Sequence, residues 1–421
     1  MPFELFETLI MKNRRYLAVL IPIALILNAC DTTSSSKPDP SAFLVSENFN
    51  RTITQQQISD FWSLIGAPEA ADYAQYDVDV YRVVYNTRGV DGNPIEASGA
   101  ILVPSGIENP GLLSIQHATI FNNDEAPSVD RNNILQGIVS VTTRKAVFAS
   151  AGYVSFLPDY LGYGITGDQL HPYQQAETLA SASYDMLFAG LEFLDQRDIQ
   201  FAGENVSLMG YSEGAYATLA LAEKIESRNN GLDLGLVSMG APIFDLTATM
   251  DYIIENLEEP MECVACYAYF LYTYHQLYNF TRPLSDYFQS PYAGRIADGL
   301  FSGENSSGFV QSQMPDEAVD LFNPSFIVRY LDGGESELRA AVAENDLFYV
   351  PIADVLLVHG DEDGVAPVFN SDDFESRALA AGKANFTYLR PEGVTHGTGI
   401  FPWGVETLEA LGVRSKRVAV N

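Results

Sequence analysis

Short apolar segments alternate with longer amphipathic segments along most of the chain. The short runs, rich in β-branched residues, predict strands buried on both faces, and the longer segments with apolar residues at helical spacing predict helices between them. The expected strands span 78–85, 100–103, 112–116, 154–157, 206–209, 235–239, 355–358 and 386–389, and the clearest helices span 134–148, 174–194 and 215–227. This order predicts an α/β fold with a doubly wound, mostly parallel, eight-stranded sheet.

One long segment interrupts the alternation. From residue 244 to residue 348 the sequence has helical and irregular patterns but no strand of comparable quality. We therefore predict a core made of residues 46–243 and 349–421, with residues 244–348 inserted as a mainly helical cap or lid. Seven of the fourteen residues in 267–280 are aromatic, which fits either the interior of the cap or the apolar wall of a binding pocket.

The amino terminus has the pattern of an export signal. A basic cluster at 12–15 precedes an apolar run at 16–27, which is too short to span a bilayer. We predict that residues 1–29 are a signal peptide. An ordinary cleaved signal without lipidation and an uncleaved anchor are the alternatives.

The end of this run indicates lipidation. Residues 27–30, Leu-Asn-Ala-Cys, resemble the bacterial lipobox, whose cysteine receives diacylglycerol and becomes the mature amino terminus. Cys30 is therefore the expected lipidation site, and 30–45 the expected flexible tether, because its first part is rich in Ser, Thr, Pro and Asp. The expected location is the cell envelope, with the membrane as a partner through the lipid anchor.

The charge balance argues against polyanionic partners. The formal net charge is −32, from 55 acidic and 23 basic residues. Nucleic-acid binding needs clustered Lys and Arg to displace counterions from phosphates, so we expect no nucleic-acid partner. A solvated acidic surface that favours solubility explains this composition, with attraction of cations as the alternative.

Cys263 and Cys266 are the only cysteines after Cys30. In an exported protein such a close pair is expected to form a small disulfide with a structural role. A redox motif is the alternative, but the pair lies outside the strand–helix–strand setting that a thioredoxin-like site needs. The neighbourhood does not offer the two further ligands of a zinc site, so no metal is expected.

The segment 210–214, Gly-Tyr-Ser-Glu-Gly, lies between the expected strand 206–209 and an alanine-rich helix. A strand, a sharp turn and a helix are what a nucleophile elbow requires, with glycines where the two backbones approach each other. With 32 glycines in the chain the pattern alone is weak evidence. The flanking elements make Ser212 the expected nucleophile, which then needs a base, a group that orients the base, and donors for an oxyanion.

Three motifs together resemble the α/β-hydrolase superfamily, and more narrowly its secretory lipase group and bacterial exported esterases. They are the segment 210–214, the turn His-Ala-Thr at 117–119, which is similar to the His-Gly-Thr turn of related hydrolases, and Pro-Asp-Tyr-Leu-Gly-Tyr-Gly at 158–164. The resemblance covers roughly 78–397 and includes a long cap before the acid turn. Ala215 departs from it, because a second glycine often follows the serine motif.

The resemblance implies a histidine base after the serine in the chain. In this superfamily the order is serine, acid, histidine, which leaves His275, His359 and His396 as candidates. His275 lies in the aromatic segment, and His359 directly follows a strand. His396 lies in a loop with a neighbouring glycine after the last expected strand, where this fold delivers its base, so His396 is the expected base.

The resemblance also implies the acid. Residues 359–367 are similar to the His-Gly-x-x-Asp-x-x-x-Pro turn of the family, in which the aspartate, here Asp363, orients the catalytic imidazole. Asp361 and Glu362 are rivals for this role. The dense carboxylates around them also fit a solvated turn.

Two backbone NH groups are expected to form the oxyanion hole. One is the NH of Glu213. The other belongs to the turn 117–119, which follows the expected strand 112–116, and Thr119 or Ala118 is the donor there. Ala118 replaces the glycine of the family, so the local backbone is expected to differ. His117 is expected to stabilise this turn, and His171 to be structural.

The resemblance implies hydrolysis of carboxylic esters by a serine esterase or lipase without metal or organic cofactor. The expected substrates are small-molecule esters or plant- and polymer-derived esters. A serine peptidase or amidase of the same fold would use the same residues, because only the pocket selects the leaving group. A non-catalytic lipoprotein that binds glycans or partners at the surface is the alternative from another class.

Overall fold

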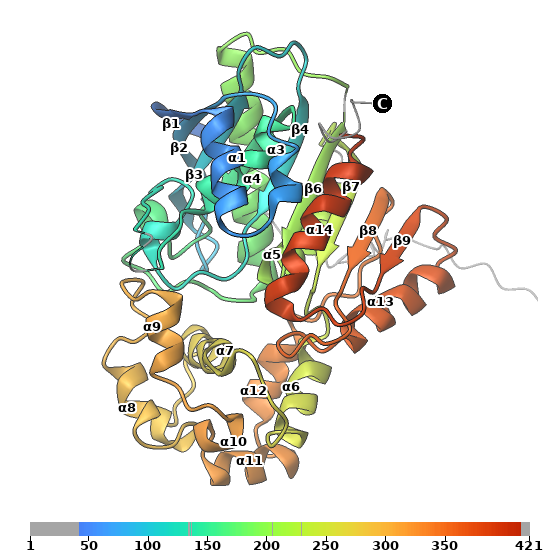
Figure 1. The fold of residues 1–421 in the computed structure, drawn as a ribbon. Helices are drawn as coiled ribbons and strands as arrows, with labels where there is room; N and C mark the ends of the chain where they lie inside the picture. The colour runs from blue at the N-terminus through green and yellow to red at the C-terminus, as the bar shows by residue number, and fades with distance from the viewer. Residues whose placement is uncertain (1–41, 134, 136, 204, 229, 414–421) are drawn as a thin grey trace, which may run out of the picture. The chain divides into compact units, whose positions relative to one another are not determined.

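A computed structural model describes residues 42–133, 135, 137–203, 205–228 and 230–413 (Figure 1). The expected signal peptide, the lipidation site Cys30 and most of the expected tether lie outside these residues. Among the described helices, none is long and apolar enough to cross a membrane.

A nine-stranded sheet forms the centre of the described chain. The strands are β1 (Leu44–Ile53), β2 (Val78–Arg88), β3 (Pro94–Pro104), β4 (Gly111–Gln116), β5 (Tyr153–Pro158), β6 (Asn205–Tyr211), β7 (Asp233–Gly240), β8 (Asp354–Val358) and β9 (Phe386–Leu389). Their order is β1-β2-β3-β5-β4-β6-β7-β8-β9, antiparallel from β1 to β5 and parallel from β5 to β9. The predicted mostly parallel α/β fold is confirmed, with nine strands instead of eight.

The additional strand is β1, at the edge of the sheet. It pairs with β2, from Leu44 opposite Tyr85 to Ile53 opposite Val78, and Ile53 is its single buried side chain. Backbone hydrogen bonds hold such an edge strand, so no alternation of buried and exposed positions marks it in the sequence. The expected tether 30–45 is therefore too long at its end, because Leu44 and Val45 already belong to β1.

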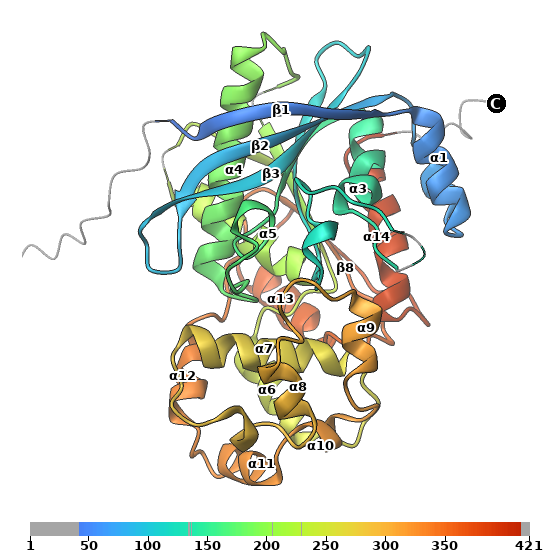
Figure 2. The same cartoon turned by 90° about the vertical axis from the view of Figure 1, so that its left-hand side faces the viewer.

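Helices cover both faces of the sheet (Figure 2). Two of them, α3 (Val141–Ser150) and α14 (His396–Ala410), pack on one face, and α4 (Ala176–Gln196) and α5 (Glu213–Glu226) pack on the other. The remaining core helices are α1 (Gln55–Leu64), α2 (Pro68–Ala71) and α13 (Phe369–Ala380), with short 3-10 turns η1 (Asn123–Glu125) and η3 (Gly164–Thr166). The helices expected at 174–194 and 215–227 are present as α4 and α5.

The helix expected at 134–148 begins later, at Val141. An isolated bridge pairs Asn133 with Ile138, and Gly137 has φ +72°. A residue in the left-handed region interrupts a helical backbone. The apolar spacing of this segment therefore extends beyond the helix itself.

The segment between β7 and β8 contains helices and no strand among its described residues. These helices are α6 (Leu246–Glu255), α7 (Val264–Leu277), α8 (Tyr292–Ala297), α9 (Ser307–Ser312), α10 (Ala318–Leu321), α11 (Pro324–Leu331) and α12 (Ser336–Ala343), with the 3-10 turn η4 (Leu284–Asp286). They lie together beyond one end of the sheet (Figures 1 and 2). Hydrogen bonds join them to the core, for example from the Tyr274 hydroxyl to the carbonyl of Gln174 (2.9 Å).

Candidate active site

Ser212 occupies the sharp turn between β6 and α5. Its backbone has φ 57° and ψ −124°, a combination that costs a residue with a side chain on the order of 1–3 kcal/mol. The Ser212 NH donates to the carbonyl of Gly240 at the end of β7 (2.8 Å). The surrounding structure thus holds a strained turn that presents the hydroxyl at the carboxyl end of the sheet.

Two glycines allow this turn to close. A Cβ at Gly210 would lie less than 3.0 Å from the carbonyl oxygen of Gly214, and a Cβ at Gly214 would lie less than 3.0 Å from the carbonyl oxygen of Gln116 in β4. These neighbours are backbone atoms, which cannot move aside as a flexible side chain does. The close approach of strand and helix therefore requires glycine at both positions.

Gly214→Ala is expected to lower both the stability of the protein and the reactivity of Ser212. The added methyl group pushes α5 away from β4, and overpacking of this kind costs about 1–3 kcal/mol. A displacement of about 1 Å at Ser212 is expected to slow its reaction with a fluorophosphonate on the order of 10²-fold. Thermal unfolding and labelling rates measure the two effects. Gly294→Ala in α8 is the control, because a Cβ there has no neighbour within 4 Å; equal behaviour of the two variants would contradict this account.

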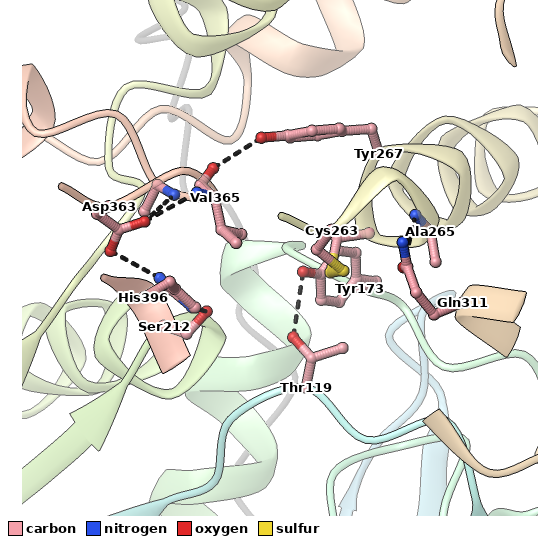
Figure 3. The surroundings of a disulfide bond; sticks show 12 residues. Thr119, Tyr173, Ser212, Cys263, Ala265, Tyr267, Gln311, Asp363, Val365 and His396 are labelled. Carbon is pink, nitrogen blue, oxygen red and sulfur yellow. Dashed lines mark hydrogen bonds and ion pairs between the residues drawn. A yellow bond between two sulfur atoms is a disulfide. The ribbon is translucent and has the colours of Figure 1, made fainter. Parts of the chain in front are cut away.

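Three side chains from separate parts of the chain meet beside the turn (Figure 3). His396 places Nε2 3.0 Å from Ser212 Oγ and Nδ1 2.7 Å from Asp363 Oδ2. Ser212 follows β6, Asp363 follows β8 and His396 follows β9, so the carboxyl ends of parallel strands bring them together. The structure places the expected nucleophile, base and acid in one hydrogen-bonded series.

The loop after β8 holds the carboxylate of Asp363. Asp363 Oδ1 accepts hydrogen bonds from the backbone NH groups of Val365 (2.9 Å) and Ala366 (2.7 Å), and its side chain is fully buried. Burial opposes ionisation, but hydrogen bonds from His359 and His396 outweigh it and hold the pKa of Asp363 below its ordinary value. Asp363 is therefore ionised at neutral pH and keeps a proton on Nδ1 of His396.

A second histidine contacts the same carboxylate. His359 Nε2 lies 3.2 Å from Asp363 Oδ2, the atom that His396 also contacts, and the ring is fully buried. Its Nδ1 lies 2.7 Å from the hydroxyl of Ser371. His359 therefore supports the acid and has no contact with Ser212. Its place as the first residue of the acid turn was the available sequence signal.

The other candidates from the sequence lie away from the serine. Asp361 and Glu362 are exposed, and the Asp361 carboxylate accepts a backbone NH at 2.7 Å. His275 is in the last turn of α7, where its Nε2 faces a backbone carbonyl at 2.7 Å. Among the described histidines, His396 alone is hydrogen-bonded to Ser212.

The expected oxyanion donors lie at the start of α5 and in the turn after β4. Within the described chain, the backbone NH groups of Glu213, Ala118 and Thr119 donate no hydrogen bond to another residue. Gly214 packs directly on the end of β4, so the two sets of NH groups are close. The Thr119 hydroxyl donates to the Tyr173 hydroxyl (3.1 Å) (Figure 3). The candidate oxyanion donors in that turn are therefore its two backbone NH groups, those of Ala118 and Thr119.

His117, which precedes these donors, contacts backbone carbonyls. Its Nδ1 lies 2.8 Å from the oxygen of Ala118 and its Nε2 lies 3.1 Å from the backbone oxygen of Asp159. Burial lowers the pKa of His117 to about 4, so the ring is neutral at neutral pH. The Asp159 carboxylate accepts the hydroxyl of Ser98 (2.6 Å) and is tied into the fold rather than into the serine site.

Tyr211 contributes to the site, although nothing in the sequence pattern singled it out. Its hydroxyl donates to the backbone carbonyl of His396 (2.7 Å), and its ring centroid lies 5.3 Å from that of the imidazole. Its ring also lies 5.4 Å from that of Trp403 in α14. Tyr211 therefore holds the start of α14 against the serine turn. Its place directly before Ser212 was the only available signal.

A disulfide at the start of α7 lies beside the acid loop (Figure 3). It joins Cys263 to Cys266. The residues on either side of it contact the acid loop, because the Glu262 NH and the Tyr267 hydroxyl donate to backbone carbonyls there, at 3.1 and 2.9 Å. The disulfide therefore braces the cap segment that supports the acid loop, which is a structural use.

An apolar hollow opens onto Ser212. Helix α6 contributes Leu246, Met250 and Ile253 to its wall, and α7 contributes Cys266, Tyr267 and Phe270. None of the described residues that line it is charged at neutral pH. The aromatic segment 267–280 thus has two uses, since Tyr267 and Phe270 face the hollow while Tyr269 is buried in the core.

The order of the site residues along the chain and the strands that they follow identify the fold class. A strained serine turn after one parallel strand, followed in the chain by an aspartate after a later strand and a histidine after the last, is the arrangement of one structural class. The chain has the α/β-hydrolase fold. In the described part of this α/β-hydrolase, no group of three or more His, Cys, Asp or Glu side chains is arranged to hold a metal ion.

Solved structures share this fold. A candidate hydrolase from Legionella pneumophila is 23% identical, covers 87% of this chain and 96% of its own, and has a TM-score of 0.77. The rice cell wall degrading esterase LipA from Xanthomonas oryzae is 22% identical, with coverages of 89% and 97% and a TM-score of 0.71. Candida antarctica lipase A in its closed state is 14% identical, with coverages of 89% and 83% and a TM-score of 0.61.

One protein-family model matches the part of the chain that contains the serine turn. The Prolyl oligopeptidase family matches residues 139–263, which include Ser212 but neither Asp363 nor His396. No curated protein matches the chain. The protein is thus a serine hydrolase of the α/β-hydrolase fold, and its pocket has to distinguish esters from peptides.

Proposed function

We propose that this hydrolase cleaves carboxylic esters with an apolar acyl group. The hollow beside Ser212 carries this proposal, because its wall is apolar and uncharged among the described lining residues. Each methylene group buried in such a wall contributes about 0.8 kcal/mol. An acyl chain bound there brings its carbonyl carbon to the hydroxyl of Ser212.

In the proposed first step, His396 Nε2 accepts the Ser212 proton as Oγ attacks the ester carbonyl. The NH of Glu213 and that of Ala118 or Thr119 stabilise the oxyanion. The C–O bond to the alcohol then breaks, and the alcohol takes the proton from His396. This leaves an acyl group on the serine oxygen.

In the proposed second step, His396 removes a proton from a water molecule, which attacks the acyl carbonyl. The bond to Ser212 Oγ breaks, the serine recovers its proton, and the carboxylic acid leaves. Asp363 keeps the imidazole in the required tautomer and stabilises its cation in both steps. Among these groups, Asp363, His396 and Ser212 are hydrogen-bonded in that order.

Peptide or amide hydrolysis is the nearest alternative, because the Prolyl oligopeptidase family matches the serine turn. A peptide brings several backbone amide groups that need hydrogen-bond partners when they are buried. Besides Ser212, the uncharged polar side chains of the described lining are those of Gln174 and Thr249 and the hydroxyl groups of its tyrosines. The similarity to an esterase and a lipase over most of the chain also supports an ester substrate.

The test compares a p-nitrophenyl ester with the p-nitroanilide of the same acyl group. The ester is expected to be hydrolysed and the anilide not, with kcat/KM rising up to about fourfold for each added methylene until the hollow is full. A series of peptide p-nitroanilides tests the peptidase alternative. Equal turnover of ester and anilide, or no dependence on chain length, would overturn the proposal.

We further propose that Cys30 anchors this enzyme to a membrane of the cell envelope. This proposal rests on the lipobox-like residues 27–30. The tether that follows would let the enzyme act on esters near the membrane surface.

A further inference from the structure

A buried acid–histidine pair lies behind the proposed oxyanion hole. His171 Nε2 is 2.6 Å from Glu213 Oε1, and each side chain is only 1% exposed. His171 belongs to the connection between β5 and α4. Gly162 makes room for it, because a Cβ there would lie less than 3.0 Å from the His171 backbone. The proposed reaction uses neither side chain as an acid or a base.

The contacts of the imidazole determine how many protons the pair holds. His171 Nδ1 lies 2.7 Å from the carbonyl oxygen of Leu161, which can only accept, so Nδ1 carries a hydrogen. Nε2 faces the Glu213 carboxyl group at hydrogen-bonding distance, so a second proton lies between them, on the imidazole or on the carboxyl group. In either form the pair has zero net charge.

Glu213 is the first residue of α5, and its NH is a proposed oxyanion donor. An uncompensated carboxylate on the same residue would repel the negative charge that develops on the substrate. We propose that His171 is a positioning residue for the hydrolysis, which holds Glu213 in a pair of zero net charge so that the oxyanion meets the NH without an opposing charge. This inference rests on the proposed ester hydrolysis.

The other titratable groups around the pair are neutral near neutral pH. Those facing it in the described chain are His117 after β4, Tyr160 and Tyr163 after β5, Tyr173 before α4, and Tyr269 in α7. Burial lowers the pKa of His117 to about 4 and raises the pKa of all four tyrosines above their ordinary value. Between about pH 6 and pH 9, these groups therefore stay uncharged.

The test compares kcat for ester hydrolysis in H171Q and H171Q/E213Q. Glutamine can donate a hydrogen bond to Glu213 but cannot neutralise it. Relative to the wild type, H171Q is therefore expected to lose about tenfold or more in kcat. The double variant removes the carboxylate and is expected to regain activity.

A role in packing alone would give a loss of kcat in H171Q with no gain in the double variant. That result, with normal wild-type turnover, would overturn the proposal. H275Q is the matched control and is expected to keep the wild-type kcat, because His275 lies outside the site.

A second measurement is independent of turnover. In ¹H–¹⁵N spectra of the wild type, the imidazole signals of His171, identified by their loss in H171Q, are expected to show a hydrogen on Nδ1, which faces the carbonyl oxygen of Leu161. A ring without that hydrogen would overturn the pair of zero charge. Absence of wild-type ester turnover, with a hydrogen on His171 Nδ1, would instead overturn the proposed function and, with it, the role of the pair in the reaction.

Discussion

Ser212→Ala is expected to lower kcat for ester hydrolysis by about 10⁶-fold. The alanine lacks the Oγ that forms the acyl-enzyme. The remaining groups can only polarise the ester carbonyl for direct attack by water. The fold should be retained, because the only side-chain hydrogen bond of Ser212 among the described residues is the one to His396, and alanine keeps the Cβ that the strained turn already accommodates. Steady-state kinetics and thermal unfolding measure the two effects.

Ser227→Ala provides a matched control at the other end of α5, where the side chain is exposed and bonds only locally, to the carbonyl of Lys224 (3.2 Å). This variant is expected to keep wild-type kinetics and its labelling by a fluorophosphonate, while Ser212→Ala loses both. A labelled and active Ser212→Ala protein would remove Ser212 as the nucleophile. A wild-type protein that is neither labelled nor active would favour the non-catalytic binding function.

The fold could be predicted where burial leaves a regular pattern. Most of the expected strands carry runs of buried side chains, as in β6, where the last four residues are buried. Strand β1 lacks that pattern because it lies at the edge and bonds through its backbone. The start of α3 was misplaced because apolar spacing does not report the left-handed backbone of Gly137.

The site could be predicted where a role depends on local motif and chain order. Ser212, Asp363 and His396 each follow a strand, and the sheet brings those ends together. Contacts between distant segments leave no such trace. His171 and Glu213 are 42 residues apart and meet only after β5, α4 and β6 have assembled, and the position of His359 behind Asp363 depends on how the acid loop closes.

Asp363→Asn is expected to lower kcat by about 10⁴-fold through the tautomer of His396. Asp363 Oδ1 accepts two backbone NH groups, so the amide oxygen of asparagine must occupy that position. The amide NH₂ then replaces Oδ2 and faces the imidazoles of His396 and His359. It donates to Nδ1 of His396, which moves the ring proton to Nε2, and Nε2 can then no longer accept the proton of Ser212.

Asp361→Asn and Glu362→Gln are the matched controls, since both acids were rivals for this role and both are exposed. They are expected to stay within a few-fold of the wild type, because neither side chain contacts His396 in the described structure. Comparable losses in all three variants would mean that the charge of the turn matters rather than one acid. A normal kcat in Asp363→Asn would mean that His396 keeps its tautomer without the carboxylate, and would overturn the assignment of Asp363.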